Sequence, residues 1–141
     1  MKLDVTSLAD AIVSLEDGIG VVSDEQWFNA QSKAVQNTLI AGVIQNFEFV
    51  YELSIKMLKR KMEMDAATPT EVDFGNFRDL LRTAAEKGLI ADVTAWFDYR
   101  QMRNITSHTY DSEKAFLVYQ GTLKFIGDAK ALLKILVSRN V

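Results

Sequence analysis

The residues best suited to chemistry lie in one stretch, Arg103–Asp111, which holds the only histidine of the chain. If this stretch continues a helix, steps of about 100° per residue place Asn104 and His108 on one face, with Arg103 beside it. The guanidinium of Arg103 is a fixed fork of donors, and an imidazole can donate, accept or transfer a proton near neutral pH. Together with the phenol of Tyr110, these groups suit a phosphate-bearing ligand.

A structural interpretation competes with this one. Asn104 and His108 can satisfy the last carbonyls of a helix, and Arg103 can be a solvated cation near its C-terminus. On spacing alone the structural interpretation is favoured, because short motifs recur by chance.

The composition indicates a single globular domain, residues 1–141. A chain of this length with 48% hydrophobic and 25% charged residues can bury a sizeable core. It has no Cys, which excludes disulfides and thiolate metal sites. The N-terminal residues lack the apolar run of a signal peptide, and no apolar stretch is long enough to span a bilayer. We therefore expect a cytoplasmic protein without membrane contact. A net charge of −3 argues against a broad electrostatic grip on nucleic acid.

Apolar residues recur at helical spacing in every long segment, and no segment shows the sustained alternation of a strand. The first helix is expected from Thr6 to Gly18 or Val22, and a further helix can start at Ser23, which has capping-box spacing to Gln26. The longest helix is expected from about Ser32 to Met64, followed by a short helix that Asp73 caps and Gly88 ends. The last two are a helix that starts at Asp92 and one from Asp111 or Ser112 to about Ser138. The pattern predicts an all-α fold, an antiparallel up-down four-helix bundle with an additional short helix.

The two longest helices are apolar over too wide an arc for one contact. In residues 32–64 an apolar stripe from Val35 to Met57 is flanked on both sides by further apolar residues, wider than the ~100° that a surface helix needs. The last helix carries one stripe from Phe116 to Val137 and a second from Val118 to Leu136. A second subunit or a partner protein is the economical account, so we expect a homodimer.

Other candidate sites are weaker. Glu48 and Glu52 lie four apart and could hold a metal or act as acid and base, but the favourable Glu52–Lys56 spacing indicates a solvated face. A bundle metal site would repeat Glu-x-x-His on two helices, which one histidine cannot supply. We therefore expect no metal site. Three further arginines are possible outer cations of the site: Arg78, Arg82 and Arg100. Five aromatic residues are expected in the core: Phe47, Phe49, Trp96, Phe97 and Phe125.

Two runs carry a resemblance to a known family. Arg103-Asn104, followed after two residues by Ser107-His108-Thr109-Tyr110-Asp111 and preceded by Trp96-Phe97, resembles the small bacterial family of nucleotidyltransferase substrate-binding proteins. The run Asn46–Lys56 is similar to the family's other signature, with Ile55 where an aromatic is usual, and Gly88-Leu89-Ile90 also fits. The resemblance spans nearly the whole chain.

This resemblance implies a helical substrate-binding subunit. Members belong to the HEPN superfamily of nucleotide-binding four-helix bundles and are typically encoded beside a minimal nucleotidyltransferase that carries the metal-binding carboxylates. The implied assembly is a two-component nucleotidyltransferase, in which this chain has no cofactor of its own and the partner holds Mg²⁺ and the nucleoside triphosphate. The family is also similar to the helical domain that helps to hold the substrate in one-chain aminoglycoside nucleotidyltransferases.

The resemblance also implies an alternative, a toxin of a toxin–antitoxin pair. Many HEPN proteins are metal-independent ribonucleases whose Arg-x4-6-His motif is paired across a homodimer, which would make Arg103 and His108 catalytic and RNA a partner. Related proteins with a Tyr two residues after the His are inactivated by nucleotidyl transfer onto it, and Tyr110 holds that position. Under either alternative, Arg103, Asn104, His108 and Tyr110 are the expected substrate- or nucleotide-binding residues.

Overall fold

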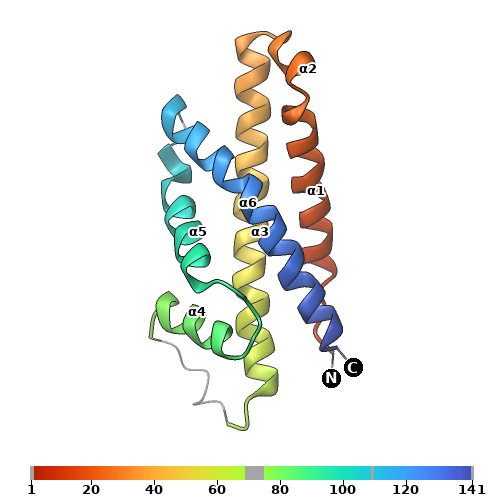
Figure 1. Ribbon diagram of the computed structural model, residues 1–141, viewed down its shortest axis with the longest axis vertical. Helices are drawn as coiled ribbons and strands as arrows, with labels where there is room; N and C mark the ends of the chain where they lie inside the picture. Colours follow the sequence, from red (N-terminus) through yellow and green to blue (C-terminus); the bar gives the residue numbers. More distant parts are fainter. Residues whose placement is uncertain (1, 69–74, 109, 141) are drawn as a thin grey trace.

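The fold is an up-down bundle of helices, seen in a computed structural model that describes residues 2–68, 75–108 and 110–140. Its elements, in chain order, are α1 (Thr6–Ser23), α2 (Glu25–Asn29), α3 (Lys33–Asp65), α4 (Phe77–Glu86), α5 (Val93–Ile105), a 3₁₀ turn (Thr106–His108) and α6 (Ser112–Ser138). The long helices alternate in direction: α1 and α5 run upward in Figure 1, whereas α3 and α6 run downward. The predicted all-α bundle is confirmed, and the described residues contain two short helices, α2 and α4, beside the four long ones.

Side-chain caps fix where several helices begin. Ser32 accepts a hydrogen bond from the backbone N–H of Val35, Asp92 from that of Ala95 and Asp111 from that of Glu113, as their positions predict. These bonds satisfy N–H groups that have no partner within the helix.

Two helices begin at caps other than the predicted ones. Asp24, rather than Ser23, caps α2, because the Asp24 carboxylate accepts from the backbone N–H of Trp27 while the Ser23 hydroxyl donates back to the Gly20 carbonyl. Asn76 caps α4 by accepting from the backbone N–H of Asp79, and the predicted cap Asp73 lies outside the described residues.

Gly88 ends α4 as predicted. Its φ of 75° lies in the left-handed region, where a side chain would be strained. The N–H of Leu89 donates to the Ala84 carbonyl at 2.9 Å and the N–H of Gly88 to the Ala85 carbonyl at 3.0 Å, which is the Schellman pattern. The chain can therefore reverse into α5.

Five aromatic side chains from three helices form the centre of the core. The ring of Phe125 in α6 lies 4.9 Å from Phe47 in α3 and 4.9 Å from Tyr99 in α5, both edge to face. Trp96 and Tyr51 complete the cluster at 5.8 and 6.5 Å from Phe125. Edge-to-face pairs are favoured by the charge distribution of the rings, so the cluster fixes angles as well as distances.

Polar contacts tie α6 to the rest of the bundle. Lys130 pairs with Glu16 in α1, and the Tyr99 hydroxyl donates to Asp128. Near the two ends of the chain, the backbone N–H of Leu3 donates to the Asn140 side-chain oxygen at 2.9 Å, and the Asn140 amide donates to the Leu3 carbonyl at 2.7 Å. The termini accordingly lie together at the lower end of the bundle (Figure 1).

One side of each wide apolar arc is left without cover. In α6 the stripe that includes Val118 and Phe125 is buried, whereas Phe116 and Leu123 of the other stripe are 57% and 48% exposed. Phe49 in α3, predicted to lie in the core, is 53% exposed, so that prediction is wrong. Among the described residues, none of the helices is both long and apolar enough to cross a bilayer.

We expect Phe47→Ala to lower the free energy of unfolding by about 3–5 kcal/mol, because truncating a buried aromatic loses its transfer energy and leaves a cavity. Phe49→Ala is the matched control, with the same change two residues along the same helix at an exposed site, and should stay within about 1 kcal/mol. Urea denaturation followed by circular dichroism measures both. Equal losses would contradict the burial of Phe47 and the exposure of Phe49.

Candidate functional site

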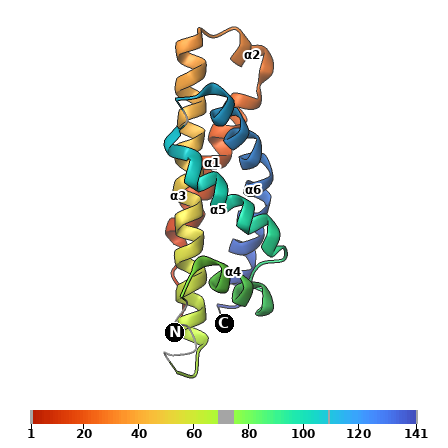
Figure 2. The ribbon, with the colours of Figure 1, turned by 90° about the vertical axis from the view of Figure 1, so that its left-hand side faces the viewer.

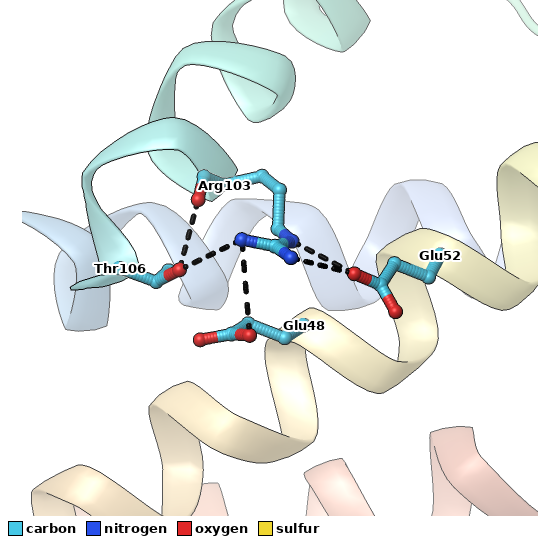
Figure 3. A network of polar contacts seen from close by, with 4 residues as sticks. All are labelled: Glu48, Glu52, Arg103 and Thr106. Atoms are coloured by element: carbon cyan, nitrogen blue, oxygen red, sulfur yellow. Dashed lines mark hydrogen bonds and ion pairs between the residues drawn. The ribbon is translucent and has the colours of Figure 1, made fainter.

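Arg103 reaches from the last turn of α5 to the middle of α3 (Figure 3). Its Nε and Nη2 donate to Oε1 of Glu52 at 3.0 and 2.7 Å, and its Nη1 lies 3.8 Å from Oε2 of Glu48. Glu48 and Glu52 are one helical turn apart, so both face the same guanidinium. Glu52 and Lys56 are exposed, as expected for a solvated face, but Glu52 pairs with Arg103 of α5 instead of Lys56.

Thr106 completes the surroundings of Arg103. Nη1 of Arg103 donates to the Thr106 hydroxyl at 3.2 Å, and that hydroxyl donates to the Arg103 carbonyl at 2.8 Å. The hydrogen bond to Glu52 raises the pKa of Arg103, so the guanidinium is charged at neutral pH. One third of the Arg103 side chain is exposed, so the fixed cation is open to a ligand.

The prediction that Asn104 and His108 share one helix face is wrong. The α-helix ends at Ile105, and Thr106–His108 form a 3₁₀ turn, which advances about 120° per residue instead of 100°. The prediction assumed an unbroken α-helix. Both side chains are exposed, so neither is occupied as a buried cap.

His108 and Tyr110 remain close to each other. Their ring centroids are 6.2 Å apart at an interplanar angle of 67°. Tyr110 is 86% exposed and so is accessible to another molecule. The structure thus divides the predicted site, with Arg103 bound to α3 and the His108–Tyr110 pair facing solvent.

A groove begins at Tyr110. It has a volume of about 770 Å³ and lies between the α1–α2 region, the first half of α3 and the first half of α6. Its apolar lining includes Val22, Phe28, Ile40, Ile44, Phe116 and Leu123. Glu25, Gln36 and Asn37 add polar groups. An apolar surface with a few polar groups is typical of small-molecule sites.

The described residues offer no group of three or more His, Cys, Asp or Glu side chains that could hold a metal ion. The three arginines expected as outer cations of the site lie at the contact between α4 and α5, each over an aromatic ring.

The comparisons with known proteins agree with this fold. The family model described as "Nucleotidyltransferase substrate binding protein like" matches residues 3–138. The chain belongs to this family. It is 49% identical to the "Probable ribonuclease HepT" of Haemophilus influenzae over 139 residues, which cover 99% of this chain and 95% of that protein.

A solved structure is also similar. It is that of HI0074 from Haemophilus influenzae, described as revealing the fold of a substrate binding domain of a nucleotidyltransferase. The TM-score is 0.91 at 48% sequence identity, and the match covers 94% of this chain and 98% of that one.

The two runs that carry the family resemblance meet in space. Glu48 and Glu52 belong to the run Asn46–Lys56, and Arg103 opens the other run (Figure 3). Sequence reasoning missed this partnership because it paired Glu52 within its own helix. Two carboxylates one turn apart on the long helix were a signal, since they also form a receptor for a cation from another helix.

A double-mutant cycle tests the Arg103–Glu52 pair. We expect a coupling free energy of about 0.5–1 kcal/mol between Arg103→Ala and Glu52→Ala, because the pair is partly exposed, and a smaller value in 1 M salt (about a 3 Å Debye length). Denaturant titration gives the four unfolding free energies. The control cycle combines Glu52→Ala with Lys56→Ala and should show less coupling; the opposite ranking would restore the predicted Glu52–Lys56 pair.

Proposed function

We propose that this chain is the helical substrate-binding subunit of a two-component nucleotidyltransferase. The observation that carries the proposal is the family match over residues 3–138. The likeness to a solved structure described as a substrate binding domain of a nucleotidyltransferase supports it. The partner in this proposal is a separately encoded minimal nucleotidyltransferase that brings Mg²⁺ and the nucleoside triphosphate.

The groove beside Tyr110 supports a role in holding the acceptor. Its volume of about 770 Å³ suits a small molecule, and its lining combines an apolar wall with the amides of Gln36 and Asn37. Because Tyr110 is exposed at the groove, a partner's active site can approach an acceptor held there. Reaction would require the acceptor nucleophile to face the triphosphate bound by the partner.

We also propose that the chain forms a homodimer. Exposed apolar side chains on α6 that do not line the groove support this, since Leu117 is 59% and Val137 53% exposed. Apolar patches of this kind mark interaction surfaces more often than they remain in water.

Sedimentation velocity tests the assembly. We expect the purified chain to sediment as a dimer, and to form a heavier complex with the nucleotidyltransferase encoded beside its gene. Leu117→Asp should weaken association by about tenfold or more, because it places a charge in an apolar contact. Val13→Asp makes the same kind of change at a residue of similar exposure on α1, 56%, and should have no such effect. A chain that stays monomeric and does not bind the nucleotidyltransferase encoded beside its gene would contradict the proposal.

A second candidate function is a ribonuclease silenced by its partner. The observation that favours it is the 49% identity to a protein named "Probable ribonuclease HepT". His108, which is exposed, would act as general base or acid on the ribose 2′-OH. Arg103 would stabilise charge on the phosphate, using N–H groups beyond those that bind Glu52 and Thr106, since a guanidinium has five.

Silencing would act on Tyr110. Its phenol oxygen would attack the α-phosphorus of ATP, forming a P–O bond as the bond to pyrophosphate breaks and pyrophosphate leaves. The phenol proton must pass to a base, because a phenol has a pKa of about 10. The proposal assigns this proton to the partner's metal-binding carboxylates, since the His108 ring lies 6.2 Å from that of Tyr110.

Intact-mass spectrometry tests this second candidate. After incubation with the cognate nucleotidyltransferase, Mg²⁺ and ATP, the wild type should gain the mass of AMP and Tyr110→Phe should not. Tyr119→Phe is the matched control at another tyrosine of the same groove and should still gain it. If no variant is modified by a partner that is active on another acceptor, the second candidate is removed and the substrate-binding subunit remains.

A further inference from the structure

Three arginines stack on two phenylalanines where α4 meets α5. Arg100 of α5 lies 3.6 Å over the ring of Phe77 in α4, measured from Cζ to the ring centroid. Arg78 and Arg82 of α4 lie 4.9 and 5.8 Å over the ring of Phe97 in α5. Each helix thus places arginine side chains over a phenylalanine ring of the other, two from α4 and one from α5. We call these five residues the arginine–phenylalanine cluster.

Holding α4 in place does not require three cations. Leu80, Leu81 and Ala84 of α4 are already buried against the bundle. Like charges gathered at one place repel one another, which opposes the folded state unless something else is gained. The arginines therefore add positive charge to a contact that apolar residues already bury.

The guanidinium groups of Arg78 and Arg82 are available for hydrogen bonds, whereas that of Arg100 also lies beside the buried Tyr51 hydroxyl. Within the part of the chain that the structure describes, no ion pair joins Arg78, Arg82 or Arg100 to a carboxylate. A guanidinium placed over a ring is held there by its charge and keeps N–H groups that can donate to a phosphate. Arg103 differs from these arginines, because its N–H groups donate hydrogen bonds to Glu52 and Thr106.

The surroundings favour an anion at this cluster. Arg78 and Arg82 are exposed and Arg100 is half-buried, so the cluster is open to solvent. Figure 2 shows α4 and α5 together on one side of the bundle. The chain as a whole carries a net charge of −3, so three unneutralised arginines form a local positive site on an acidic protein. Rings and guanidinium planes also offer stacking surfaces to a nucleobase.

We propose that the arginine–phenylalanine cluster at the α4–α5 contact binds the phosphate groups of a nucleotide ligand. Two sources share this chemistry, a free nucleoside triphosphate and a single-stranded RNA. In both, the N–H edges of Arg78, Arg82 and Arg100 donate to phosphate oxygens, while the stacked rings hold the guanidinium planes in position. The site is separate from the groove at Tyr110 and is formed by the chain alone.

Binding by the full chain, without a partner, tests the proposal. One arm follows the fluorescence anisotropy of a labelled oligouridylate of about twelve nucleotides, within the length range that such surfaces cover. The other arm measures ATP by isothermal titration calorimetry. Binding in either arm that depends on the arginines supports the proposal, and the arm that shows it identifies the source of the phosphates.

Arg78→Gln/Arg82→Gln should lower the affinity by about tenfold or more, and for RNA should reduce the slope of log affinity against log salt by about one to two, because two phosphate contacts are lost. Lys124→Gln/Lys134→Gln removes the same net charge from α6 and should change affinity less than about twofold. Arg78→Lys/Arg82→Lys keeps the charge and should retain salt-dependent binding, which separates a phosphate contact from a structural role. Thermal unfolding of each variant shows whether the fold is kept.

The proposal is overturned if neither ligand binds the wild type at millimolar concentration, or if the α6 control loses as much affinity as the Arg78→Gln/Arg82→Gln variant. It is also overturned if the lysine variant, with an unchanged melting temperature, loses binding as completely as the glutamine variant. None of these results bears on assembly with a nucleotidyltransferase, which sedimentation measures.

Discussion

The burial of Phe125 is the interaction on which the rest of the structure depends. Its ring is fully buried in α6 and touches aromatic rings of both α3 and α5. Because rigid rings meet edge to face, the cluster sets the distance and the rotation of the three helices together. The end of the Met102 side chain of α5 lies over Gly121 of α6, so a side chain at Gly121 would displace it.

The polar site follows from this packing. Because α5 is packed against α3, the last turn of α5 lies near Glu48 and Glu52, and Arg103 forms ion pairs with their carboxylates. The chain then tightens into the 3₁₀ turn, which the Thr106 hydroxyl joins to the Arg103 carbonyl. After this turn His108 and Tyr110 are exposed to solvent, and Tyr110 lines the groove. A helix end held by an ion pair and followed by exposed side chains can present groups to a partner without loosening the core.

The sequence predicted local features well and cross-helix partners poorly. Helix ends depend on side chains within three residues, so Asp92, Asp111 and Gly88 could be assigned from sequence. Partners of Glu52 depend on how the helices pack, which periodicity does not encode. The same limit explains Phe49, because an apolar arc shows that a helix buries more than one side and not which residues a second chain would cover.

Arginines of this chain serve two different purposes because of what lies beside them. Arg103 meets two carboxylates, so its charge is neutralised locally and its position is fixed. Arg100, one turn earlier on the same helix, meets the face of Phe77 instead, and an aromatic face attracts a cation without cancelling its charge. One helix, α5, therefore carries one arginine that two carboxylates fix in place and, one turn earlier, another that an aromatic ring holds.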